Sequence, residues 1–103
     1  MIDQDGALRN KKIRGWIVRI LYRSYPAGFE IDTLCRQLNN LGYAVTRNDL
    51  QANLTYLKED GFVENPQFGG GAILDGISNE FWKLTTKGID LAEGTIADSG
   101  VDL

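Results

Sequence analysis

One short segment of the chain carries side chains that can hydrogen-bond the edges of nucleic-acid bases. Its candidate contact residues are Arg47, Asn48, Gln51, Ala52, Thr55 and Lys58. Asparagine and glutamine can each form paired hydrogen bonds to an adenine edge, and arginine can do so to guanine. A small alanine lets the backbone approach and can touch a thymine methyl. We therefore expect Asn48, Gln51 and Thr55 to read bases, with Arg47 and Lys58 contacting phosphate or guanine.

The leucines of the same segment predict the element that presents these side chains. Leu50, Leu54 and Leu57 recur at i, i+4 and i+7, which indicates an amphipathic helix that buries them. At about 100° per residue, the candidate contact residues fall on the opposite side of that helix or on one flank. Any solvated helix shows polar residues opposite its leucines, so a helix that merely packs is the alternative interpretation.

Both ends of this helix carry recognisable signals. Thr46 is a favourable N-cap, and Asp49 stands three residues later, where its carboxylate can reach back as in a capping box. Val45 and Leu50 have the spacing of a hydrophobic staple. Gly61 is expected to end the helix. Asp49 is thereby explained as part of the cap, not as an acid that faces a ligand.

Charges are distributed unevenly along the chain. Residues 1–58 carry nine basic and five acidic side chains, whereas residues 59–103 carry two basic and nine acidic ones. The net charge is −3, yet residues 9–23 contain six basic side chains and no acid. Such a stretch suits phosphate, although a charge run can also be an ordinary solvated helix face. The additional expected DNA contacts are Lys11, Lys12 and Arg36.

Periodicity predicts two helices before this segment. The first covers residues 7–24, and its expected buried stripe consists of Ile13, Trp16, Ile17, Ile20 and Leu21. The second covers residues 30–40, and its expected buried stripe consists of Ile31, Leu34, Cys35, Leu38 and Leu41. Gly42 follows at the position where a left-handed C-terminal cap is expected.

A small hairpin and a last helix are expected after the segment. The strands are predicted at residues 62–64 and 80–84, with Trp82 and Leu84 on one face. Thr85 should cap the last helix, which Gly94 ends. Residues 1–94 are therefore expected to form one mainly helical domain, and residues 95–103 a flexible acidic tail.

The composition excludes several function classes. The chain has 103 residues, 43% of them apolar, which fits one domain. With a single cysteine, Cys35, and no histidine, an internal disulfide and a Cys/His zinc site are excluded, and Cys35 is expected in the core. No catalytic or phosphate-loop motif is present, so we expect neither an enzyme nor a cofactor. We see no membrane-spanning run and no apolar N-terminal signal, which favours a cytoplasmic location.

The order of elements resembles the winged helix-turn-helix domain. Residues 34–41 are similar to the first helix of the pair, residues 45–47 to the turn, and LTYLKEDGFVE to the end of the second helix with the first wing strand. The run FWKLTTKGIDLAEG looks like the second wing strand and closing helix of ArsR-, PadR- and MarR-like regulators. The likeness covers about residues 10–94, and the small size is also similar to winged-helix proteins encoded in prophages.

This resemblance implies a small transcriptional regulator that binds double-stranded DNA with sequence specificity. It places the helix of residues 46–60 in the major groove as the recognition helix. A homodimer is expected, through the first helix, the last helix or both, because pairing two domains across a pseudo-palindrome compensates for few contacts per domain.

Two features of the hairpin depart from that family pattern. No lysine or arginine lies between Phe62 and Phe81, whereas three acids do, so we expect little contribution of the wing to DNA binding. The apolar group of the intervening loop must fold onto its own domain or onto a partner; it consists of Phe68, Ala72, Ile73, Leu74 and Ile77. The alternative function is a protein-interaction module that uses the acidic C-terminal half and the loop 68–77.

Overall fold

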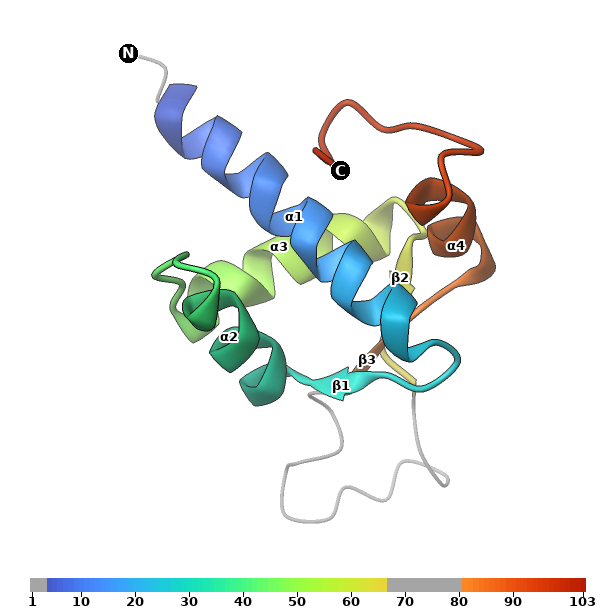
Figure 1. Cartoon of the computed structure of the whole chain (residues 1–103), viewed down its shortest axis with the longest axis horizontal. Helices are drawn as coiled ribbons and strands as arrows, with labels where there is room; N and C mark the ends of the chain where they lie inside the picture. The colour runs from blue at the N-terminus through green and yellow to red at the C-terminus, as the bar shows by residue number, and fades with distance from the viewer. Residues whose placement is uncertain (1–3, 67–80) are drawn as a thin grey trace.

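The computed structural model describes residues 4–66 and 81–103. Its elements, in chain order, are α1 (Gln4–Ser24), β1 (Phe29–Glu30), α2 (Ile31–Asn40), α3 (Arg47–Glu59), β2 (Val63–Glu64), β3 (Phe81–Leu84) and α4 (Thr86–Ala92). Within the described residues the chain is thus mainly helical, with a small antiparallel sheet (Figure 1). The predicted loop 68–77, with its apolar group, lies outside the described residues.

The long helix α1 crosses α3 and supplies much of the core (Figure 1). Ile13, Ile17 and Leu21 are fully buried, as the predicted stripe requires. Trp16 is only half-buried, while Val18, which the stripe omits, is fully buried. The stripe is wider than predicted because α2, α3, α4 and the sheet all contact α1.

Two residues of the predicted α2 stripe are less buried than expected. Ile31, Leu34 and Leu38 are in the core, but Leu41 is 45% exposed. The helix ends at Asn40, so Leu41 is already its C-cap and leaves the helical face. Cys35, expected in the core, is half-buried at the edge of the α2–α3 contact.

The sheet contains a strand that the sequence pattern did not predict. Its order is β1–β3–β2, with Phe29 opposite Trp82 and Val63 opposite Leu84. The alternation predicted for β3 is confirmed, since Trp82 and Leu84 are buried. A Cβ on Gly28 would collide with the backbone oxygen of Trp82, so the chain can reach β3 here only with glycine.

The segment after α4 differs from the predicted loose tail. It turns back toward α1 and α3 (Figure 1), and the amide of Asp102 donates to the carbonyl of Lys11 over 3.0 Å. Val101 is only 8% exposed. The polar composition gave no sign of this docking, which rests on few apolar side chains and on polar contacts with residues distant in sequence.

No helix among residues 4–66 and 81–103 combines the length and the apolar character needed to cross a membrane.

Candidate nucleic-acid interface

The outer face of α3 presents the six side chains of this helix that were predicted to contact DNA. Arg47, Asn48, Gln51, Ala52, Thr55 and Lys58 are each exposed. On the inner face Leu50, Leu54 and Leu57 have no exposed surface. The two sets separate because leucines at i, i+4 and i+7 fix the rotation of the helix about its axis.

The first turn of α3 is held by the predicted capping box. The amide of Asp49 donates to Thr46 Oγ1 over 3.1 Å, and the amide of Thr46 donates to Asp49 Oδ2 over 3.2 Å. These bonds satisfy two backbone amides that a helix end leaves unpaired. The start of α3, where Arg47 and Asn48 project, therefore has a defined position.

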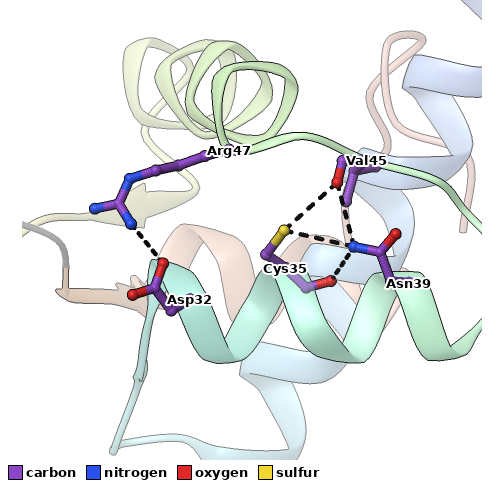
Figure 2. A network of polar contacts seen from close by, with 5 residues as sticks. All are labelled: Asp32, Cys35, Asn39, Val45 and Arg47. Atoms are coloured by element: carbon purple, nitrogen blue, oxygen red, sulfur yellow. Dashed lines mark hydrogen bonds and ion pairs between the residues drawn. The ribbon is translucent and has the colours of Figure 1, made fainter.

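A second set of contacts braces the turn between α2 and α3 (Figure 2). Asn39 Nδ2 donates to the carbonyl of Cys35 over 2.8 Å and to that of Val45 over 3.2 Å. The thiol of Cys35 also lies 3.5 Å from the carbonyl oxygen of Val45. Because Val45 precedes the N-cap of α3 directly, Asn39 fixes the end of α2 against the beginning of α3.

Arg47 is engaged with an acid on α2 (Figure 2). Its Nη1 lies 2.5 Å from Asp32 Oδ1, and both side chains are more than half exposed. An exposed ion pair contributes only about 0–1 kcal/mol, so a phosphate or a guanine edge can compete for the guanidinium. Asp32 thus positions Arg47 beside the outer face of α3 and also lowers its availability.

The inner flank of α3 holds a polar cluster that is structural. Asn53 is 3% exposed and accepts from Arg14 Nε over 2.9 Å. Arg14 also donates to the carbonyl of Gly100 over 3.1 Å and stacks 3.7 Å from the ring centre of Tyr56. Arg14 therefore joins α1, α3 and the C-terminal segment, and its charge faces these elements.

The other cations of α1 are placed less favourably than the basic run suggested. Lys12 is exposed, but its Nζ lies 3.7 Å from Asp102 Oδ2. Lys11 is half-buried, and Arg36 is exposed on α2. Arg9, which was not among the predicted contacts, donates through Nη2 to the carbonyl of Ala44 over 2.8 Å. Of the α1 cations, Arg9 is therefore the one hydrogen-bonded to the turn that leads into α3.

A groove lies between α3 and the sheet. Its volume is about 460 Å³, and its lining residues are Gln51, Thr55, Lys58, Glu59, Asn65 and Trp82. Among the buried side-chain nitrogen and oxygen atoms of the described residues, Trp82 Nε1 is the one without a hydrogen-bond partner. The alternation of β3 predicts that the Trp82 indole is buried, but it does not predict whether the indole N–H has a hydrogen-bond acceptor.

The contacts of Tyr56 link α3 to the C-terminal segment. Its hydroxyl donates to Asp98 Oδ1 over 3.2 Å. Burial and the Asp98 carboxylate both raise the pKa of Tyr56 above the ordinary value of 10.0, against the opposing effect of Arg14. The phenol therefore keeps its proton and remains a donor to Asp98.

The exposed side chains of α3 can donate hydrogen bonds to base edges and accept hydrogen bonds from them, and the flanking cations can contact phosphate. The outer face contains amides, a hydroxyl and two cations, and its helix is fixed at the N-terminal end. Comparison of the chain with protein-family models, with curated proteins and with solved structures gave no match.

Proposed function

We propose that this chain is a winged helix-turn-helix domain that binds double-stranded DNA with sequence specificity, as a small transcriptional regulator. The observation that carries the proposal is the outer face of α3, where all six candidate contact residues are exposed on a helix with a capped and braced N-terminus. The tight turn between α2 and α3 and the antiparallel pairing of β2 with β3 agree with that arrangement.

The residues of α3 have distinct roles in this proposal. Asn48 and Gln51 read base edges through paired hydrogen bonds. Thr55 donates its hydroxyl proton to the carbonyl of Gln51 over 2.9 Å, so it faces the groove as an acceptor. An acceptor there suits the amino groups of adenine or cytosine. Arg47 and Lys58 contact phosphate or guanine, as Lys11, Lys12 and Arg36 contact phosphate from α1 and α2.

Two copies are expected to act together. One domain offers few base contacts, and a homodimer across a pseudo-palindrome doubles them. We expect the contact through α1, α4 or both, and the exposed apolar side chains Leu8 (54% exposed) and Tyr22 (38% exposed) support a contact through α1.

Selection from random duplexes tests the proposal. Wild-type protein should enrich one sequence, and Asn48→Ala or Gln51→Ala should each weaken binding to it by about 1–3 kcal/mol and relax the preference at one position. Asn40→Ala, at an exposed asparagine on α2, is the matched control and should bind as wild type does. Failure to enrich any sequence, with equal binding by all three variants, would exclude the proposal.

The second candidate function is a protein-interaction module on the same scaffold. It is favoured by the nine acids of residues 59–103 and by the lack of cations between Phe62 and Phe81. A partner of this kind would bind through the acidic half and the loop 68–77. Loss of partner capture after replacement of that loop, together with absence of DNA binding, would support this function over the first.

A further inference from the structure

The C-terminal segment of residues 95–103 covers part of the basic surface of α1. Its last residues lie against the helix, since the amide of Asp102 donates to the carbonyl of Lys11 over 3.0 Å. Val101 is buried beneath it, and Ile96 packs partly against the core. The close approach needs glycine in α1, since a Cβ on Gly15 would collide with the backbone oxygen of Asp102.

The same segment brings carboxylates to the cations of α1 and to the flank of α3. Asp102 lies 3.7 Å from the ammonium group of Lys12. Asp98 accepts from the Tyr56 hydroxyl over 3.2 Å and from the amide of Gly100 over 2.7 Å. Arg14 is also occupied, since it donates to the carbonyl of Gly100 over 3.1 Å. These contacts place the Asp102 carboxylate beside Lys12 and the Asp98 carboxylate beside Tyr56, two groups that could otherwise donate to phosphate.

We propose that this segment is an autoinhibitory clasp, which occupies with its own oxygens the surface of α1 that a DNA phosphate would contact. The inference rests on the proposed function, because it concerns how tightly the domain holds a duplex. With the clasp closed, Lys12 is paired and Asp98 and Asp102 repel the phosphate backbone. With the clasp displaced, Lys12 becomes available and the two acids leave the side of α3 that faces α1.

The contacts of the clasp are of a kind that can open and close. The ion pair of Lys12 with Asp102 is exposed on both sides, so it is weak and is screened by salt. Val101 is the one side chain of the segment in the buried core cluster. Segments with few buried apolar contacts open locally at a small fraction of the free energy of global unfolding.

Gly15→Ala tests the clasp without changing any charge. The added methyl must displace the backbone at Asp102, and alanine is at least as good a helix former as glycine, so α1 itself is preserved. On a mixed-sequence duplex at low salt, we expect this variant to bind about 3–10-fold more tightly than wild type, with a salt slope steeper by about one phosphate contact. Exchange of the Asp102 amide with solvent should be faster in the variant, which verifies the displacement.

Asp102→Asn tests the charge without the steric change. It should bind the same duplex about 2–3-fold more tightly, because one carboxylate is removed from the phosphate path. Asp90→Asn is the matched control: it changes the net charge equally on the exposed surface of α4 and should have a smaller effect. Circular dichroism and urea unfolding test whether each variant is folded. If Gly15→Ala does not fold, the affinities of Asp102→Asn and Asp90→Asn for the duplex decide whether the clasp inhibits binding.

The inference is overturned if Gly15→Ala and Asp102→Asn bind the mixed-sequence duplex no more tightly than wild type and Asp90→Asn, or if none of them binds it. Its failure is separable from that of the proposed function, which depends on whether one sequence is enriched. Enrichment with four equal affinities would retain the regulator and remove the clasp. Tighter binding by the two variants without enrichment would retain the clasp and remove sequence specificity.

Discussion

Asn53 shows that a helical wheel does not predict which flank of a helix another element will cover. Its position on α3 is one residue before Leu54, so the helical wheel puts it on the flank, where an amide is usually solvated. In the structure α1 covers that flank, and the amide bonds Arg14, Asn10 and the carbonyl of Asp49. The leucine spacing predicted the rotation of α3, but nothing local to α3 could predict which flank α1 would cover.

We expect Asn53→Ala to destabilise the domain by about 2 kcal/mol. The substitution leaves the part-buried Nε of Arg14 without its acceptor, and an unsatisfied buried polar group costs about 1–3 kcal/mol. Urea unfolding followed by circular dichroism measures the change. Asn48→Ala, at an exposed asparagine of the same helix, should stay within about 0.5 kcal/mol of wild type. Equal stability of the two variants would show that the cluster around Arg14 contributes little.

At the scale of elements, prediction succeeded where the signals were local. The capping box at Thr46 and Asp49 and the cap at Thr85 are confirmed, because each needs only residues within one turn. The strand Phe29–Glu30 was missed, since two residues show no alternation and the pairing with β3 is distant in sequence. Docking of residues 95–103 was missed for the same reason: its bonds join Asp102 to Lys11 and Gly100 to Arg14.

The contact between α3 and the C-terminal segment should make stability depend on alkaline pH. The raised pKa of Tyr56 means that the folded state holds the phenolic proton more tightly than the unfolded state. The resulting stabilisation is fully present below the ordinary tyrosine pKa of about 10 and is lost as pH rises through the higher folded-state pKa. The free energy of unfolding should therefore fall more steeply with pH in wild type than in Tyr56→Phe.

Urea unfolding of both proteins between about pH 8 and about pH 11 measures this difference. The gap in unfolding free energy between wild type and Tyr56→Phe should shrink toward the alkaline end. The other tyrosines are shared by the two proteins, so their titration cancels from the gap. A gap that stays constant across the range would contradict the assigned contact of Tyr56 with Asp98.

At the scale of the whole molecule, the described end of the acidic C-terminal half lies against the basic helix α1. Acids from the C-terminal half meet cations of α1, as the pair of Lys12 with Asp102 shows. The outer face of α3 carries uncharged side chains, which are proposed to contact bases, between two cations, Arg47 and Lys58. Composition predicted the imbalance between the halves, but only the path of residues 95–103 shows that part of it is cancelled on one surface.

This partial cancellation sets how strongly DNA binding should depend on salt. With Lys12 held by Asp102, and with Arg47 exchanging Asp32 for phosphate, four cations of one subunit are expected to contact phosphate: Arg36, Arg47, Lys58 and Lys11. At about 0.9 released counterions per contact, a dimer should give a slope near −7 in a plot of log affinity against log salt, and a monomer a slope near −4. Fluorescence anisotropy on the enriched duplex measures the slope, and sedimentation velocity of the complex gives the number of subunits. Because each subunit alone has so few contacts, we expect two subunits on the duplex and the steeper slope. A single subunit with a slope near −4 would contradict the homodimer. A slope near zero would contradict phosphate binding by these cations.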